Sequence, residues 1–285
     1  MPHTRVVITG AAGMLGSALM ELAPGAFEAV GVDLPDADLT DPAQAMQAVA
    51  DPRPVAVVHC AAYTDVDGCT RDPELAFRAN AEATANVARA CRACGAHLLV
   101  LSTDYVFDGE KGAPYDEDDE PCPINPYGES KLQGERRALQ EHDRVLIVRT
   151  QWLFGPGGRN FVHTIVTKGR ELGSLKVVAD EFGSPTYTRD LAPRLWELAG
   201  RQPVGLLHCA ASGICSWADL AREALDAAGA GHVQVSEISR TQWESPTRRP
   251  RYSPLVSVRL PEIGLPPLRS WRPAVREYAA THLCR

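Results

Sequence analysis

Short apolar runs alternate with helix-like segments through the first half of the chain, and this alternation restricts the fold most strongly. The helix-like segments are residues 14–22, 43–49, 74–92 and 127–140. The apolar runs, rich in Val, Ile or Leu and bounded by Gly, Asp or Pro, are residues 5–9, 29–32, 55–62, 97–102 and 145–150. Runs of this length are typical of strands in a parallel sheet that is buried on both faces. The pattern therefore predicts an α/β fold with a doubly wound parallel sheet.

The second half of the chain has a looser pattern. Pro and Gly become frequent after residue 150, and strand-like pieces (176–179 and 206–209) alternate with helices such as 217–227. The sequence shows no internal repeat and no flexible linker. We predict one domain over residues 1–150 and a smaller α/β domain over residues 151–285, with a segment near 185–211 returning to the first domain. A cleft between the two domains is expected.

Composition excludes several classes of function. The 285 residues carry a formal charge of −7, and no basic run is present. Such a chain is a poor partner for nucleic acid or an anionic membrane surface, because both are polyanions. No apolar stretch approaches the roughly 20 residues that span a bilayer, and no leader pattern precedes the first strand. We expect a soluble cytoplasmic protein whose eight cysteines are free thiols.

Two clusters of candidate metal ligands favour ordinary structural roles. Cys91 and Cys94 form a CxxC inside a helical pattern, without a second pair at zinc-finger spacing. Residues 116–120 form an acidic run, which we interpret as a solvated loop rather than a cation site. We therefore assign no metal site.

A glycine pattern follows the first predicted strand directly. Gly10, Gly13 and Gly16 form a GxxGxxG that opens the first helix. In this context Gly10 permits a tight turn, Gly13 lets a pyrophosphate approach the backbone, and Gly16 allows close packing of helix on strand. The pyrophosphate would bind free N–H groups at the helix N-terminus. The pattern predicts a Rossmann-type dinucleotide site rather than an ordinary structural turn.

Asp33, at the end of the second strand, bears on the choice of dinucleotide. A carboxylate at that position accepts hydrogen bonds from the adenosine ribose and repels a 2′-phosphate. Its neighbours Leu34, Pro35 and Asp36 supply no cation. The local pattern favours NADH over NADPH, unless a distant arginine folds into reach.

Tyr127 and Lys131 form the strongest catalytic candidate. Lys131 is one of only four lysines, and it follows Tyr127 by four residues at the start of a predicted helix. That spacing places both side chains on one helix face. A nearby ammonium stabilises a phenolate, so we expect Lys131 to lower the pKa of Tyr127. The pair would act as a general acid/base in a carbonyl–alcohol interconversion; a pair on the helix surface is the alternative.

Polar residues at the end of a buried strand support the catalytic interpretation. Ser102, Thr103 and Asp104 end the apolar run that begins at residue 97. Ligands of open α/β sheets bind outside the carboxyl ends of the strands. Thr103 is expected to donate to the substrate carbonyl, and Asp104 to bind substrate hydroxyls. Ser102 points to the opposite side of the strand, which favours a structural role.

The motifs together resemble a known family. The glycine pattern, Thr103 and the Tyr127–Lys131 pair are similar to those of the extended short-chain dehydrogenase/reductases. More specific segments resemble the dTDP-4-dehydrorhamnose reductases. These segments are 60–67, 102–109, 125–131, 149–155, 182–186 and 249–253.

The resemblance implies a reaction and a set of residues. It implies reduction of the C4 keto group of dTDP-4-dehydrorhamnose by NADPH or NADH to give dTDP-L-rhamnose. Thr103, Tyr127 and Lys131 would be catalytic, and Thr103, Asp104 and Trp152 would contact the sugar. Trp152 in the interdomain core is the alternative for that residue. The dinucleotide would contact Gly10, Gly13, Met14, Leu15, Gly16, Asp33, Asp38, Leu39, Ala62, Tyr63, Thr64, Tyr127 and Lys131. A homodimer is compatible with this family.

Related activities remain as alternatives. Similar dehydratases place Asp-Glu after the threonine, whereas here Tyr105 follows Asp104, which disfavours dehydration. Epimerases share the Tyr/Lys pair. The regulatory β subunit of methionine adenosyltransferase also resembles this fold and keeps a nucleotide site without catalysis, although the retained catalytic residues favour an enzyme. The sequence leaves open the nucleotide and the stereochemistry of the sugar.

Overall fold

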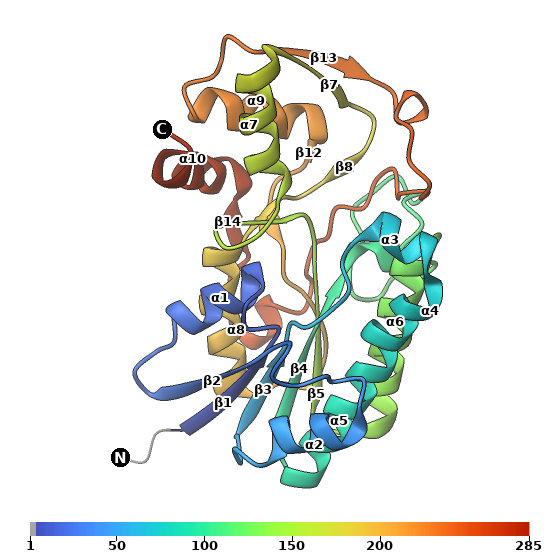
Figure 1. The fold of residues 1–285 in the computed structure, drawn as a ribbon, viewed down its shortest axis with the longest axis vertical. Coiled ribbons are helices and arrows are strands. Elements are labelled where there is room, and N and C mark those ends of the chain that lie inside the picture. Colours follow the sequence, from blue (N-terminus) through green and yellow to red (C-terminus); the bar gives the residue numbers. More distant parts are fainter. Residues whose placement is uncertain (1–3, 285) are drawn as a thin grey trace.

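Six parallel strands form the central sheet of the computed structural model, which describes residues 4–284 (Figure 1). The spatial order is β2-β1-β3-β4-β5-β10. The strands are β1 (Thr4–Thr9), β2 (Phe27–Val32), β3 (Ala56–His59), β4 (His97–Thr103), β5 (Val145–Thr150) and β10 (Gly205–His208). After β2 the chain returns past β1 to form β3, so the winding reverses between β1 and β3. In open α/β sheets, ligands bind at such a reversal, outside the carboxyl ends of the strands. The predicted α/β, doubly wound fold is confirmed.

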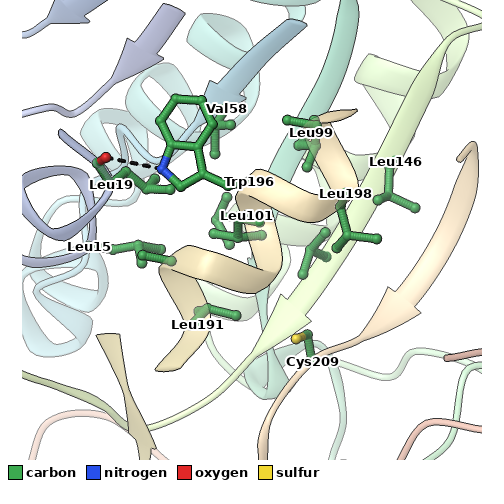
Figure 2. Close-up of a cluster of buried hydrophobic side chains, with 14 of the residues drawn as sticks. Leu15, Leu19, Val58, Leu99, Leu101, Leu146, Leu191, Trp196, Leu198 and Cys209 are labelled. Carbon is green, nitrogen blue, oxygen red and sulfur yellow. Dashed lines mark hydrogen bonds between the residues drawn. The ribbon is translucent and has the colours of Figure 1, made fainter. Parts of the chain in front are cut away.

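Helices cover both faces of this sheet (Figure 1). One face packs against α1 (Met14–Glu21) and α8 (Thr188–Arg201). Figure 2 shows Trp196 of α8 within this cluster, and its indole N–H donates to the carbonyl of Leu19 at 3.1 Å. The other face packs against α2 (Pro42–Ala50), α5 (Ala83–Cys94) and α6 (Pro126–Glu141). Burial on both faces explains why the strand sequences are continuously apolar.

The segment between β3 and α5 departs from the predicted pattern. The predicted strand over residues 55–62 is shorter, because β3 ends at His59, where its neighbour β1 also ends. The predicted helix over residues 74–92 is interrupted. α3 (Val66–Arg71) and α4 (Pro73–Phe77) precede a π-helical turn, η1 (Arg78–Glu82), which leads into α5. A 3-10 turn, η2 (Asp104–Val106), follows β4.

The second half of the chain forms a smaller α/β region at the upper end of Figure 1. Its larger elements are α7 (Phe161–Leu172), β7 (Ser174–Val178), α9 (Trp217–Ala227), β13 (Gln234–Ile238) and α10 (Trp271–His282). Short strand pairs complete it: β6 (Leu153–Phe154) with β9 (Thr186–Tyr187), β8 (Phe182–Gly183) with β12 (Cys215–Ser216), and β11 (Ala211–Ser212) with β14 (Leu268–Ser270). Two 3-10 turns are η3 (Arg240–Gln242) and η4 (Pro261–Ile263). α8 and β10 lie on the large sheet instead. Within residues 4–284, no helix is long and apolar enough to cross a bilayer.

The acidic run at residues 116–120 is only partly solvated. Glu117 is buried, and its carboxylate accepts the backbone N–H of His208 at 2.8 Å and of Val258 at 2.9 Å. The hydroxyl of Ser257 also donates to it. The predicted solvated loop is therefore wrong for Glu117, which supplies acceptors to backbone amides at the edge strand β10 and in the C-terminal part of the chain.

Candidate active site

The glycine loop lies at the reversal between β1 and β3. Gly10 has φ +69°, and a Cβ there would lie 2.7 Å from the backbone nitrogen of Ala61. A Cβ on Gly16 would overlap the carbonyl oxygen of Gly10. α1 begins at Met14 with Gly13 as its N-cap, and within residues 4–284 no side chain caps this end. The N–H groups of the first turn therefore point to an anion such as a pyrophosphate.

Asp33 contacts the glycine loop directly. One carboxylate oxygen accepts the N–H of Ala12 at 2.7 Å, and the other accepts the N–H of Leu34 at 2.8 Å. Farther along, Asp38 is exposed, and its carboxylate accepts the N–H of Thr40 at 2.9 Å. Leu39 instead packs its side chain into the buried cluster beneath α2 and α5. The structure thus brings Asp33 to the glycine loop, whereas the Leu39 side chain is part of the core.

Asn80 connects the end of β3 to the catalytic helix. Ala62, Tyr63 and Thr64 follow β3, and the side-chain amide of Asn80 accepts the N–H of Tyr63 at 2.8 Å. The same amide donates to the Tyr63 carbonyl and to the Ser130 hydroxyl, each at 3.0 Å. Asn80 lies in the π-helical turn η1 and is buried. Sequence reasoning missed it, because no local pattern distinguishes an asparagine between two alanines.

Thr103, Tyr127 and Lys131 converge at the carboxyl end of β4. Asn125 caps α6 by accepting the N–H of Gly128, which places Tyr127 in the first turn and Lys131 one turn later. The Lys131 ammonium donates to the carbonyl of Leu101 at 2.7 Å. Thr103 is the last residue of β4, and its side chain lies close enough to Tyr127 to act on the pKa of the phenol. A threonine, a tyrosine and a lysine gathered at the end of one strand can support proton transfer to a carbonyl.

The pKa of Tyr127 is raised above its ordinary value, which differs from the expectation. Burial is the main cause, and the nearby groups Asp104 and Tyr105 add to it, while the hydrogen bond with Thr103 opposes it. Burial also lowers the pKa of Lys131 from 10.5 to about 8. The expectation of a lowered Tyr127 pKa is wrong for this structure, because burial outweighs the lowering effects. The Lys131 ammonium donates to the Leu101 carbonyl of β4. Tyr127 is accordingly a protonated phenol at neutral pH, as a proton donor must be.

Asp104 is buried beside these three residues and hydrogen bonds with one neighbour in sequence and one distant residue. Its two oxygens accept the hydroxyls of Thr103 at 3.2 Å and Ser253 at 2.5 Å. Burial raises its pKa from 3.8 to about 7, and both hydrogen bonds oppose that rise. Ser253 was not assigned a role from the sequence, although it lies in the 249–253 motif.

A C-terminal strap, defined here as residues 245–256, crosses the site. Arg249 of the strap donates to the Asp67 carboxylate at 3.0 Å and to the Tyr105 hydroxyl at 3.4 Å. The Tyr105 ring in turn contacts the Tyr127 ring edge-to-face, with centroids 5.4 Å apart. The strap thereby positions the aromatic wall next to Tyr127. The 249–253 motif of the strap could be found in the sequence, but the contacts of Arg249 with Asp67 and Tyr105 could not.

Trp152 belongs to an aromatic cluster. It has φ +48°, and its ring stacks on Trp217 with centroids 3.4 Å apart and planes inclined by 7°. Phe161 packs against Trp217 at 4.6 Å, and a Cβ on Gly183 would overlap the Trp152 indole. Trp217 and Gly183 therefore cover much of the indole. The rest of this half-buried ring is exposed.

Comparison with known proteins assigns the family. Residues 4–284 match the family model described as the RmlD substrate binding domain. A dTDP-4-dehydrorhamnose reductase from Streptomyces griseus is 43% identical over 283 residues, which cover 97% of this chain and 93% of the relative. The chain belongs to the dTDP-4-dehydrorhamnose reductase family. The resemblance indicated by the motifs, and the prediction of an oxidoreductase, are confirmed.

Two further relatives define the range of this similarity. A crystal structure of dTDP-4-dehydrorhamnose reductase from Bacillus anthracis in complex with NADP superposes with a TM-score of 0.94 at 38% identity, covering 97% of this chain and 98% of that one. A protein from Streptomyces antibioticus is 41% identical over 277 residues, or 96% of this chain and 94% of the relative. It is named a probable dTDP-4,6-dihydroxy-2-methyloxan-3-one 4-ketoreductase.

A cavity of about 250 Å³ lies beside the strap of this enzyme. Its lining residues are Gly109, Glu110, Gly112, Phe182, Arg251 and Tyr252. Tyr252 precedes Ser253, whose hydroxyl donates to Asp104. The lining combines two aromatic rings with one guanidinium and one carboxylate.

We predict that Asp104 makes stability depend on pH. Its pKa is raised, so the folded protein binds this proton more tightly than the unfolded chain. The contribution of the protonated group is therefore complete below pH 3.8 and is lost as the pH rises through about 7. As the pH rises from about 4 to 7, the free energy of unfolding should therefore fall less in Asp104→Asn than in wild type. Urea unfolding across that range measures the difference.

The exposed loop residue Asp36 provides the control, since Asp36→Asn should keep the wild-type dependence. Parallel curves for Asp104→Asn and wild type would contradict the assignment of this proton to Asp104.

Proposed function

We propose that this enzyme reduces the C4 keto group of dTDP-4-dehydro-6-deoxy-L-mannose (dTDP-4-dehydrorhamnose) with NADPH or NADH to give dTDP-L-rhamnose. The observation that carries the proposal is the convergence of Thr103, Tyr127 and Lys131 at the end of β4, beside the glycine loop. The domain built around the large sheet, which includes β10 and the packed helix α8, would hold the dinucleotide. The remaining second-half region and the strap would hold the sugar nucleotide.

The residues of the site suit a dinucleotide. The uncapped start of α1 offers N–H groups to a pyrophosphate, and Gly13 leaves the approach open. Met14 and Leu15 are the first residues of that helix, and Asp33 lies beside the loop to meet the adenosine ribose. When bound, a reduced nicotinamide supplies a hydride to the carbonyl carbon.

Three side chains would carry the rest of the reaction. Tyr127 donates its phenol proton to the carbonyl oxygen as negative charge develops there. The Thr103 hydroxyl, which lies beside Tyr127, would donate to that oxygen and orient it. The Lys131 ammonium stabilises the phenolate that remains. Asp104 would bind a sugar hydroxyl.

The Streptomyces antibioticus relative supports a second candidate, the 4-keto reduction of a different dTDP-deoxysugar. An assay separates the two candidates.

The purified protein is given dTDP-, UDP- and GDP-linked 4-keto-6-deoxysugars with NADH or NADPH, and the products are identified by NMR. We expect fastest turnover of dTDP-4-dehydrorhamnose to the L-rhamno product. Faster turnover of another dTDP-ketosugar would replace the first candidate with the second. Dinucleotide binding without reduction of any ketosugar in the panel would instead indicate a regulatory nucleotide-binding protein.

We predict that NADH binds at least as tightly as NADPH. Asp33 lies beside the glycine loop, where its charge would repel the 2′-phosphate of a bound NADPH. Fluorescence titration of both cofactors measures the ratio of the two Kd values. Asp33→Asn keeps a hydrogen-bond acceptor for the N–H of Ala12 but removes the charge, so it should shift the ratio toward NADPH. A clear NADPH preference in wild type that persists in both Asp33→Asn and Asp33→Ala would contradict this role.

We predict that Trp152→Ala mainly weakens binding of the sugar nucleotide. Loss of an aromatic surface against the deoxysugar should cost about 1–3 kcal/mol of binding free energy, seen as a raised KM for the ketosugar. The Kd for the dinucleotide should change little. Trp217→Ala is the matched control, because it removes the stacking partner while leaving the indole of Trp152 in place. A folded Trp152→Ala protein with an unchanged KM would assign Trp152 to the core alone.

A further inference from the structure

A buried ionic cluster lies one turn after Lys131 in α6, whereas Tyr127 lies one turn before it. Glu135 follows Lys131 by one helical turn and is buried. Its carboxylate accepts two hydrogen bonds from the Arg149 guanidinium, at 2.9 Å and 2.7 Å. It also accepts the Ser102 hydroxyl at 2.5 Å. Two guanidinium N–H groups and a hydroxyl thus donate to this buried carboxylate.

The cluster and the catalytic lysine share the same strand. Leu101 of β4 accepts the Lys131 ammonium through its carbonyl, and the next residue, Ser102, donates to Glu135. Two successive turns of α6 are therefore attached to two successive residues of the strand that ends in Thr103. Glu135 is the acidic neighbour of Lys131 on its own helix face.

The other titratable groups around Lys131 are neutral at physiological pH. Burial lowers the pKa of His59 to about 3 and raises the pKa of Cys60 to about 12. Tyr127 is a neutral phenol because its pKa is also raised. Among residues 4–284, Glu135 is thus the one ionised group of opposite charge that opposes the burial of Lys131. Arg149, on the far side of Glu135, offsets part of that attraction.

We infer that Glu135 is a positioning residue whose carboxylate keeps Lys131 in its ammonium form, with Arg149 setting how much of that charge Lys131 experiences. The catalytic consequence rests on the proposed function, in which Lys131 acts as an ammonium. Burying a lysine without a nearby anion favours the neutral amine. Removing the Glu135 charge should therefore deprotonate Lys131 at a lower pH.

Lysine NMR tests the inference without any substrate. The chain has four lysines, so a protein with ¹³C-labelled lysine side chains gives four ε-carbon signals, and Lys131→Met identifies the one from Lys131. The Lys131 pKa should be at least about 1 lower in Glu135→Gln than in wild type. Glu135→Asp keeps the charge and should keep most of the wild-type value. Glu129→Gln, at an exposed glutamate of the same helix, should leave it unchanged.

An equal Lys131 pKa in folded Glu135→Gln and wild type would overturn the inference. So would an equal decrease in Glu135→Asp and Glu135→Gln, since that result would reflect altered packing rather than charge. Should Glu135→Gln fail to fold, Arg149→Gln carries the test. It removes the cation that offsets the Glu135 charge, so the Lys131 pKa must change: upward where Glu135 stays ionised, and downward where Glu135 takes up a proton. An unchanged value would again overturn the inference.

Activity provides a separate readout. In Glu135→Gln, the alkaline decline of ketosugar reduction should move to lower pH by the same amount as the Lys131 pKa. A shifted lysine pKa in a protein that reduces none of the ketosugars would support the inference while refuting the proposed function. An unshifted Lys131 pKa in a Glu135→Gln protein that reduces the ketosugar would refute the inference and support the proposed function.

Discussion

Tyr127→Phe is expected to reduce turnover of the ketosugar at least about 100-fold while leaving dinucleotide binding nearly intact. The phenol is the proton donor of the proposed reaction, and its raised pKa keeps it protonated at neutral pH. Phenylalanine preserves the ring that contacts Tyr105 edge-to-face, so the wall of the site should persist. Single-turnover measurements of NADH or NADPH oxidation, together with cofactor titration, separate the chemical step from binding.

Tyr278→Phe serves as the matched control for this variant. Tyr278 is a buried tyrosine of α10 in the second-half region, and it should not affect proton transfer. Near-normal turnover in Tyr127→Phe would remove Tyr127 from the mechanism. Loss of dinucleotide binding in proportion to turnover would assign it to cofactor binding instead.

Lys131→Met should weaken both dinucleotide binding and turnover, which distinguishes it from Tyr127→Phe. In the proposed reaction, the Lys131 ammonium would hold the nicotinamide ribose and stabilise the Tyr127 phenolate. We expect about 10-fold weaker dinucleotide binding, as for loss of a charged hydrogen bond, and turnover lower by about 100-fold or more. Methionine fills most of the buried volume, so circular dichroism and urea unfolding should show a folded protein.

Lys168→Met, at an exposed residue of α7, is the control for loss of a lysine. Unchanged cofactor binding with reduced turnover would limit Lys131 to the proton-transfer step. Unchanged turnover would refute its catalytic role altogether.

Local patterns in the sequence determined the sheet and much of the candidate site. Apolar runs between helix signals predicted strands buried on both faces, because side-chain periodicity depends only on neighbouring residues. The roles of Gly10 and Gly16 also followed from sequence, since close backbone approach excludes any Cβ there. The spacing of Tyr127 and Lys131 on one helix face is likewise a property of helix geometry.

Only the tertiary structure decided how these groups are held and charged. Ser253 reaches Asp104 from 149 residues away, and Arg249 reaches Asp67 from 182 residues away. Asn80 contacts Ser130 across 50 residues. The acidic run predicted a solvated loop, yet Glu117 is buried against β10. The pKa directions of Tyr127 and Lys131 also depend on burial, which dominates over the charge of a neighbouring residue. Spacing along the chain determines which side chains share a face, whereas desolvation and long-range hydrogen bonds arise only when distant segments pack together.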